Sequence, residues 1–382
     1  MLLGGLVLRV NRVWQPCEDR QATSSGGNVP DVPRETEYVP RQPVVARYDR
    51  GMSRRKLLSV AIVAVSITAA VALLSSERNA PSASSVARGS GRIGIYLTSH
   101  ALAVPEIVTG FLEAREAGKL DALVINVKNM HGEVTYASDV PLAQELRAST
   151  GRIDFRLLLP ELRRRGFYVI ARLVVFFDPL LARHLGLDVD WVPADNEIAV
   201  AYNLAIAEEV ASFGFDEIQF DYIRFEDVGE LVPAYEGRFR AVEAFLEQAS
   251  DRLSERIDLS ADVFGRVLWP WNERRIDPIG QSLGGICARV DYVSPMLYPS
   301  HYVEQAYRDH PYRVVTDALQ SARDRVTARI RPFLQAFDLR LPAGMSLETY
   351  IEDQIRAAEE AGTDGYLFWH PACDYTALYN VL

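Results

Sequence analysis

The chain has 382 residues, of which 48% are hydrophobic and 24% are charged, and its formal net charge is −10. This mixture is ordinary for a globular protein and excludes disorder throughout, and the length suffices for two average domains or one large barrel. The acidic balance with three lysines excludes a general nucleic-acid binder, because phosphate binding needs clustered Lys and Arg.

The chain is predicted to begin with a targeting region. An uncharged apolar run at residues 57–74 directly follows Arg54, Arg55 and Lys56. Basic residues ahead of such a run predict a signal peptide or a membrane anchor over residues 52–76. Both alternatives stay open: an uncleaved run 57–74 would contact the membrane, and a cleaved one would release a secreted protein. Either places the rest of the chain outside the cytoplasm.

The segments that flank this run have no apolar periodicity. Residues 1–51 are rich in Pro, Arg, Gly and Ser, which predicts either a disordered tail or a mis-called extension ahead of a true start at Met52. Residues 77–91 are rich in serine and small residues and are predicted to form a flexible linker.

From residue 92 onward, short β-rich runs alternate with amphipathic helical stretches, which is typical of parallel β/α units. Eight such strands indicate a single (β/α)8 TIM-type barrel over residues 92–382, an α/β fold. An open doubly wound sheet is disfavoured, because its glycine-rich turn is absent after the first strand, and no cofactor is predicted. The predicted strands are 93–97, 122–127, 168–176, 217–223, 259–264, 292–297, 331–337 and 365–369. The clearest predicted helices are 104–117, 155–165, 202–213, 238–256 and 347–361, the last with Ser346 as its N-cap.

Carboxylates end several of these strands. The active site of a barrel lies at the carboxyl ends of its strands. Asp178 and Asp338 follow strands three and seven, and Asp221 and Asp262 lie near the ends of strands four and five. Paired carboxylates are what glycoside hydrolysis requires, one to protonate the leaving oxygen and one to attack or to activate water. An Asp after a strand also caps helices. Capping is favoured for Asp178, catalysis is favoured for Asp221, and both roles stay open for Asp338.

Candidate sugar-binding side chains lie at the same strand ends. Flat rings stack on the apolar C–H faces of sugars, and amide or cationic groups can bond hydroxyls. The alternatives are core packing for the rings and a buried polar network for Asn126 and Lys128. The candidates are Asn126, Lys128, Arg172, Arg224, Tyr298, His301, Trp369 and His370.

No metal site is predicted, because the six histidines are scattered and the three cysteines form no C-x-x-C pair. Inert buried thiols are favoured for Cys287 and Cys373, with a disulfide between them as the open alternative.

Several short segments of the sequence, the strings given at the end of this paragraph, together resemble a bacterial family of glycoside hydrolase-like barrels. This is a domain family of unknown function that is distantly similar to the α-amylase superfamily. The resemblance covers about residues 92–382 and implies a (β/α)8 barrel outside the cytoplasm that acts on a carbohydrate. It further implies Asp221 as nucleophile and Asp262 as acid/base. The superfamily has Glu at the position of Asp262 and Arg at that of Gln219, and both departures count against its retaining mechanism in this chain. The strings are 122–129, 132–134, 171–176, 215–225, 294–302, 332–337 and 365–369.

The leading hypothesis is therefore a secreted or membrane-anchored glycoside hydrolase acting on an extracytoplasmic polysaccharide. A non-catalytic glycan-binding or envelope-associated barrel is the second hypothesis, and deacetylation or lyase chemistry is the third. The geometry expected for the first is that Asp221 and Asp262 point into one open cleft bordered by Tyr298 and Trp369, at a separation nearer the range of inverting enzymes.

Overall fold

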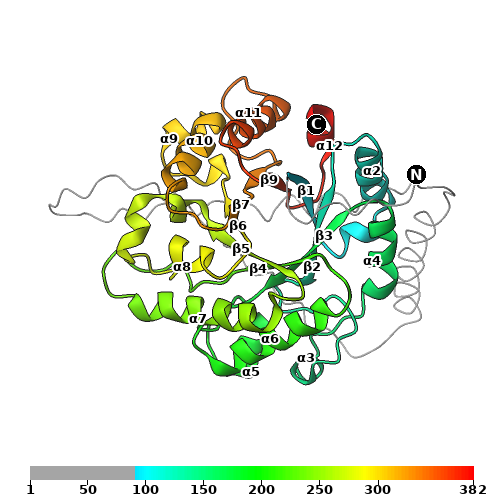
Figure 1. Ribbon diagram of the computed structural model, residues 1–382, viewed down its shortest axis with the longest axis vertical. Coiled ribbons are helices and arrows are strands. Elements are labelled where there is room, and N and C mark those ends of the chain that lie inside the picture. The colour runs from blue at the N-terminus through cyan, green and yellow to red at the C-terminus, as the bar shows by residue number, and fades with distance from the viewer. Residues whose placement is uncertain (1–90) are drawn as a thin grey trace, which may run out of the picture.

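The computed structural model describes residues 91–382, and these residues form a closed parallel barrel surrounded by helices (Figure 1). The strands pair in the order β5-β4-β3-β2-β1-β9-β8-β6-β7, and β5 also pairs with β6, which closes the sheet. The predicted (β/α)8 barrel is confirmed. The described strands are β1 (Arg92–Leu97), β2 (Ala122–Lys128), β3 (Tyr168–Val174), β4 (Glu217–Asp221), β5 (Asp258–Phe264), β6 (Tyr292–Met296), β7 (Arg329–Ile330), β8 (Phe333–Gln335) and β9 (Gly365–Trp369).

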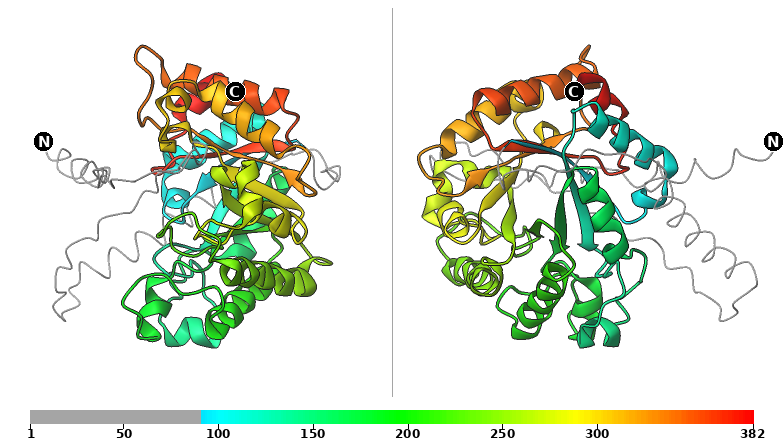
Figure 2. Two further views of the ribbon diagram at one scale, coloured as in Figure 1. Left: turned by 90° about the vertical axis from the view of Figure 1, so that its left-hand side faces the viewer. Right: turned by 45° about the vertical axis from the view of Figure 1, so that its right-hand side comes forward.

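The α-helices cover the outside of the barrel (Figure 2). Apolar side chains of sheet and helices form one continuous core. The five clearest predicted helices occur as α2, α4, α6, α7 and α11, and Ser346 caps α11 by accepting from the Thr349 N–H at 3.2 Å. The α-helices described are α2 (Pro105–Glu116), α3 (Pro141–Glu145), α4 (Phe155–Arg164), α5 (Pro179–His184), α6 (Glu197–Ala211), α7 (Glu236–Leu253), α8 (Leu283–Cys287), α9 (Gln305–Arg308), α10 (Pro311–Ala322), α11 (Leu347–Glu360) and α12 (Thr376–Val381).

The seventh barrel strand differs from the prediction. Instead of one run over residues 331–337, the chain forms the short strands β7 and β8, with Arg331 and Pro332 between them. Proline has no N–H to donate to a neighbouring strand, so it interrupts the ladder at this point. The carbonyl of Pro332 still accepts from the Leu367 N–H at 2.8 Å, which holds this segment beside β9.

The amino-terminal end of the barrel interior is closed by a buried ion pair. Arg331 donates from Nη2 to both carboxylate oxygens of Glu217, at 2.5 and 2.7 Å, and both side chains are fully buried. The Tyr168 hydroxyl donates to Glu217 at 3.0 Å, and the Arg331 guanidinium lies 4.2 Å from the ring centre of Tyr292. This polar layer fills the lumen at the end of the barrel opposite to the strands' carboxyl termini.

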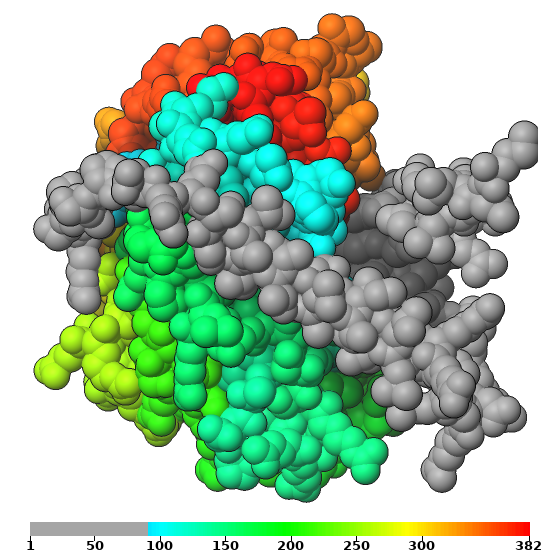
Figure 3. All heavy atoms as spheres, turned by 90° about the vertical axis from the view of Figure 1, so that its right-hand side faces the viewer, coloured from blue at the N-terminus to red at the C-terminus, as the bar shows by residue number. Residues whose placement is uncertain are grey.

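The first and last described segments of the chain meet on the outside of the barrel. Helix α12 lies against α2, as Figure 3 shows. Lys119 donates to the Tyr379 carbonyl at 2.9 Å across this contact. The contact ties the C-terminal helix to the first β/α unit, and so supports the β1–β9 closure of the barrel.

The predicted extension, targeting segment and nearly all of the predicted linker fall in residues 1–90, outside the described residues. Within residues 91–382, none of the helices combines the length and the apolarity that a membrane span needs.

Candidate active site

Two of the predicted carboxylates meet one guanidinium at the carboxyl end of the barrel. Arg172 of β3 donates to Asp221 Oδ2 through Nε at 2.9 Å and also through Nη2. The same Nε lies 4.0 Å from Asp262 Oδ2. Asp221 is 5% exposed and Asp262 is 2% exposed. The β3–β4 and β4–β5 registers place these side chains at neighbouring levels of the lumen, so the barrel itself brings them together.

A hydrogen-bonded chain orients Arg172 from the opposite side. Asn126 of β2 accepts from Arg172 Nη1 at 2.8 Å and donates to the Tyr96 hydroxyl of β1 at 2.7 Å. The Arg172 guanidinium also lies 5.3 Å from the centre of the Tyr96 ring. Four adjacent strands thus contribute to the setting of the Asp221 carboxylate, and Asn126 acts on it through Arg172.

Asp262 has the environment of a neutral carboxylic acid. Burial, and then the neighbouring Asp221 carboxylate, raise the pKa of Asp262 well above its ordinary value, although Arg172 acts in the opposite direction. Its Oδ1 is buried and has no hydrogen-bond partner within residues 91–382. Asp262 does not cap the helix that follows β5, because this 3-10 helix, Gly265–Leu268, has Phe264 as its N-cap and no side-chain cap hydrogen bond. The site therefore favours the protonated form of Asp262.

The chain turns sharply at Tyr222, immediately after Asp221. Tyr222 has φ of 53°, the left-handed region that bulky residues avoid, and this conformation ends β4 before the predicted limit at residue 223. In this conformation the Tyr222 N–H donates to Asp221 Oδ1 at 2.6 Å. The turn therefore fixes one oxygen of the carboxylate, and Arg172 fixes the other.

Gln219 lies two residues before Asp221, at the position where the resemblance described above implies an arginine. Its side chain lies inside the barrel, where it donates to Ser294 at 3.3 Å. The guanidinium that contacts Asp221 comes instead from Arg172 on the neighbouring strand, at the position paired with Gln219. The structure thus supplies an arginine to this carboxylate from β3.

Lys128 and Asp178 form a separate buried network. Lys128 is fully buried and lies 2.7 Å from Asp178, and it donates to Asn203 of α6 at 2.9 Å. The β2–β3 register shifts between Asn126 and Lys128, which takes Lys128 out of the alternation that was expected to direct it inward. Asp178 caps α5 by accepting from the Leu180 and Leu181 N–H groups at 3.1 and 2.9 Å. Lys128 therefore belongs to a buried polar network, which was the alternative to sugar binding in its prediction. Asp178 caps a helix, as its favoured prediction had it.

The predicted aromatic candidates gather after β6, β8 and β9. Tyr298 and Trp369 stack with ring centres 5.7 Å apart and an interplanar angle of 30°, and Phe337 meets the Trp369 ring edge-on at 5.1 Å. His301 lies 5.4 Å from Tyr298. Trp369 and His301 are partly exposed, whereas Tyr298 and Phe337 are buried. This cluster, Tyr298–Phe337–Trp369, forms one aromatic wall.

The two candidate histidines are both neutral at physiological pH. Burial, with a smaller contribution from Arg340, lowers the pKa of His301 to about 4. Burial also lowers the pKa of His370. The backbone N–H groups of Ala372 and Asp374 donate to His370 Nδ1 at 3.1 and 3.3 Å, so its proton is on Nε2. His370 can therefore donate one hydrogen bond from Nε2.

Asp338 is not brought to this cluster. It is exposed and makes no hydrogen bond or ion pair among the described residues. Arg224, buried at 3% exposure, lies with its guanidinium 4.3 Å from the ring centre of Trp191 and 4.4 Å from that of Phe264. The catalytic candidates that the fold assembles are therefore Asp221 and Asp262.

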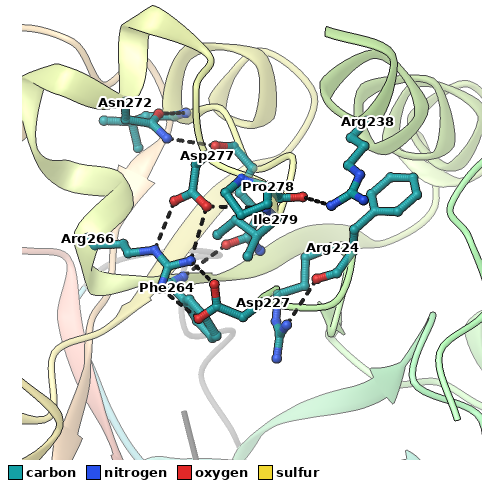
Figure 4. A network of polar contacts seen from close by, with 12 residues as sticks. Arg224, Asp227, Arg238, Phe264, Arg266, Asn272, Asp277, Pro278 and Ile279 are labelled. Atoms are coloured by element: carbon teal, nitrogen blue, oxygen red, sulfur yellow. Dashed lines mark hydrogen bonds and ion pairs between the residues drawn. The ribbon is translucent and has the colours of Figure 1, made fainter. Parts of the chain in front are cut away.

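A network around Arg266 connects the loops after β4 and β5 (Figure 4). Arg266 donates to both oxygens of Asp227, at 2.8 and 2.6 Å, and to both oxygens of Asp277, at 2.9 and 3.1 Å. Its guanidinium lies 4.9 Å from the ring centre of Phe264, the last residue of β5. These contacts hold one side of the barrel mouth in a fixed shape.

Sequence reasoning missed Tyr96 and Trp191 as residues of the site. Tyr96 is an ordinary aromatic in an apolar strand, and the signal that could have found it is its position one residue before the end of β1. Trp191 lies in the long connection between α5 and α6, where no strand end marks it. Only the fold brings Trp191 to the mouth.

Cys287 and Cys373 are buried free thiols, so the disulfide that the sequence left open is not formed. Burial raises the pKa of both, that of Cys373 to about 11. Within residues 91–382 no three or more His, Cys, Asp or Glu side chains form a group that could hold a metal ion.

Solved structures with a similar fold include several glycoside hydrolases. The PgaB (BpsB) glycoside hydrolase domain from Bordetella bronchiseptica aligns with a TM-score of 0.58 and 14% identity over 76% of this chain and 98% of that one. An endo-1,4-beta-mannanase from Rhizomucor miehei aligns with a TM-score of 0.54 and 11% identity over 80% of this chain and 96% of that one. The hyperthermostable endo-1,4-beta-D-mannanase from Thermotoga petrophila aligns with a TM-score of 0.52 and 13% identity over 73% of this chain and 88% of that one. At these identities the likeness shows the fold.

Among curated proteins none matches this chain. The family model described as "Putative glycosyl hydrolase domain" matches residues 94–375, nearly the whole barrel. This match confirms the predicted family of glycoside hydrolase-like barrels and the predicted enzyme class, hydrolysis of glycosidic bonds. The chain belongs to the putative glycosyl hydrolase domain family.

Proposed function

We propose that the protein hydrolyses an extracytoplasmic polysaccharide with Asp221 as the charged nucleophile or base and Asp262 as the neutral acid. The observation that carries the proposal is the position of Arg172, which binds the Asp221 carboxylate while Asp262, 4.0 Å from the same guanidinium, has a raised pKa. Glycoside hydrolysis requires one carboxyl group that can donate a proton beside a second that can act as nucleophile or base, and a buried Asp262 with a raised pKa beside an arginine-bound Asp221 supports this division.

Each side chain has a definite task in this proposal. Asp262 protonates the glycosidic oxygen as the bond to the anomeric carbon breaks, and Asp221 attacks that carbon or takes a proton from the attacking water. Arg172 and the Tyr222 N–H hold Asp221 in one orientation. Whether the mechanism retains or inverts follows from the carboxyl separation, for which the wider, inverting range stays our prediction.

The pH dependence of stability tests the role of Asp262 without a substrate. Because the pKa of Asp262 is raised in the folded state, the folded protein keeps a proton that the unfolded chain loses near pH 4. Its contribution to stability is therefore complete at low pH and is lost as pH rises through the folded pKa. We expect Asp262→Asn to gain stability relative to wild type as pH rises from 4 to 8, by about 1.4 kcal/mol for each unit of the shift. Thermal melts across this range measure the difference.

The pH dependence of the hydrolysis rate should also depend on the protonation of Asp262. The wild-type rate should fall as pH rises through the pKa of Asp262, because the acid loses its proton. Asp338→Asn is the matched control, since Asp338 is exposed and should leave both the melts and the pH profile unchanged. Parallel melting curves for wild type and Asp262→Asn would show that Asp262 is not held neutral and would remove it as the acid.

The burial of the two carboxylates favours a second candidate function. Asp221 is 5% exposed and Asp262 is 2% exposed, so the two carboxylates present little surface to a substrate. A barrel that binds glycans without cleaving them does not need accessible carboxylates. Such a protein would bind polysaccharide and release no reducing ends. The rate of reducing-end release therefore separates the two functions, and the hydrolase is favoured by the family to which the chain belongs.

The setting we propose is extracytoplasmic, with residues 52–76 acting as signal peptide or anchor, residues 77–91 as a linker and residues 92–382 as the enzyme. Basic residues before an apolar run stay on the cytoplasmic side. We expect protease added to spheroplasts to digest the barrel of an anchored form, or the culture medium to contain a released one. A barrel that is protected and recovered entirely in the cytoplasmic fraction would contradict this setting.

The similar structures suggest which substrates to test first. Two of them are named as endo-1,4-beta-mannanases and one as the glycoside hydrolase domain of PgaB. Soluble mannans are therefore tested first, and amino-sugar polymers, other envelope polysaccharides and neutral storage glucans complete the panel.

A further inference from the structure

We propose that Phe177, Trp191 and Tyr222 form a second aromatic wall that stacks sugars, across the barrel mouth from the Tyr298–Phe337–Trp369 wall, where the partly exposed Trp369 ring is accessible to a sugar. An extended glycan then crosses the carboxylates with sugar units bound on both sides, and the enzyme cleaves internal bonds of the chain. This inference deepens the proposed function and rests on it for the cleavage step, whereas glycan binding by the second wall can be tested independently.

The three rings form one packed group that is partly exposed. The Phe177 and Trp191 ring centres are 5.1 Å apart, those of Phe177 and Tyr222 are 5.5 Å apart, and those of Trp191 and Tyr222 are 5.7 Å apart. The Tyr222 ring is inclined by only 36° to Phe177 and 39° to Trp191. All three residues keep part of their surface accessible. One partly exposed ring is ordinary, but three such rings in mutual contact beside a candidate active site form an apolar patch that indicates a binding surface.

Trp191 is brought to the mouth by a loop that is tied to the end of β3. Phe177 and Trp191 form an antiparallel bridge, in which the Val192 N–H donates to the Phe176 carbonyl at 2.8 Å. The Asp178 N–H donates to the Asp190 carbonyl at 2.9 Å on the other side of the bridge. These backbone bonds fix Trp191 on the residues that directly follow β3, at the carboxyl end of the barrel.

Tyr222 joins the wall by means of an unfavourable backbone conformation. With φ of 53° it occupies the left-handed region, where its Cβ is crowded, and such conformations persist where the surrounding structure requires them. The turn aims the Tyr222 ring at Phe177 and Trp191 while its N–H holds Asp221. One residue thus links the second wall to the carboxylate that we assign to catalysis.

Buried cationic groups support the back of this wall. The Arg224 guanidinium contacts the Trp191 and Phe264 rings, with centres at 4.3 and 4.4 Å, and Arg266 contacts Phe264 from the network of Figure 4. Cation–π contacts of this kind restrain a ring in one orientation. Trp191 is therefore held in place before any ligand arrives, and a preorganised ring loses less entropy on binding.

The two walls lie on opposite sides of the barrel. The second wall follows β3 and β4, and the first follows β6, β8 and β9. In the closed strand order, β9 is as far from β4 as the barrel allows, and Figure 1 shows these two strands across the barrel from each other. Asp221 ends β4 and Asp262 lies near the end of β5, and β5 lies between the strands of the two walls in the closed order. A glycan stacked on both walls must therefore pass the carboxylates with sugars on either side.

Affinity electrophoresis of the full chain tests the second wall. We expect soluble galactomannan, glycol chitin or another polysaccharide of the panel to retard the wild-type protein, and Trp191→Ala to weaken that retardation at least tenfold. Trp191→Phe keeps a flat ring and should restore most of the affinity. Trp269→Ala is the matched control, because Trp269 is also a partly exposed tryptophan but packs on Tyr307 instead of the wall. Wild-type affinity in a folded Trp191→Ala variant, or no retardation of the wild type by any polysaccharide, would overturn the second wall.

End-labelled oligosaccharides of the polysaccharide that is cleaved test the mode of cutting. We expect products of several intermediate lengths from the wild type, and a shift of the cleavage positions together with a higher KM in Trp191→Ala. A single short product released from one end would overturn internal cleavage. If the protein binds polysaccharide through Trp191 and releases no reducing ends, the hydrolase proposal fails and the second wall stands.

Discussion

Asp221→Asn should lower the rate of glycan hydrolysis by roughly 10²- to 10⁴-fold while the barrel stays folded. Asparagine keeps the size of the side chain and one acceptor oxygen but can neither attack a sugar carbon nor take a proton from water. Reducing-end release at saturating substrate measures the loss, and thermal melts measure folding.

Folding should survive because a second carboxyl group lies beside Arg172. The Asp221 charge is one cause of the raised pKa of Asp262, so its removal should lower that pKa and allow the Asp262 carboxylate, 4.0 Å away, to balance the guanidinium. The matched control is Asp338→Asn, which should hydrolyse at the wild-type rate because Asp338 is exposed and lies apart from the cluster. Should Asp221→Asn retain wild-type turnover, the catalytic assignment of Asp221 is wrong.

Arg331→Ala should cost about 3–5 kcal/mol of unfolding free energy, the largest stability effect that we predict. The substitution leaves the fully buried Glu217 carboxylate without the guanidinium that lies 2.5 and 2.7 Å from its oxygens. It also opens a cavity at the closed end of the barrel. Urea unfolding followed by circular dichroism measures the difference.

An exposed pair and a double variant separate charge from packing in this prediction. Arg356→Ala removes an exposed ion pair with Asp353 and should cost less than about 1 kcal/mol. Replacing both partners, as in Glu217→Leu with Arg331→Met, removes the unpaired charge and should recover much of the loss. A loss for Arg331→Ala as small as that for Arg356→Ala would show that the buried pair contributes little.

The sequence was sufficient to predict the barrel, because parallel β/α units have a strong periodic signal and seven of the eight strands lie close to their predicted limits. The seventh was predicted as one strand, since its apolar run hides the effect of Pro332 on the ladder. The proximity of Asp221 and Asp262 was also predictable, because both lie near the carboxyl ends of adjacent strands and a barrel places such ends side by side.

Side-chain direction was harder to predict than position. Lys128 was expected to point inward by simple alternation, but the irregular register of β2 and β3 turns it to Asp178. Trp191 lies in a connecting loop and Tyr222 takes a left-handed conformation that no local pattern in an aromatic residue indicates. Both depend on long-range contacts, which a single sequence does not reveal.

The most direct test of the whole account is the number of reducing ends that the full-chain protein releases from the polysaccharide panel, with Asp221→Asn and Asp262→Asn assayed in parallel. We predict release by the wild type from at least one polysaccharide, and release at least about 10²-fold slower by both variants. No release by the wild type, or equal release by wild type and both variants, would contradict the proposal that this carboxyl pair hydrolyses a glycan.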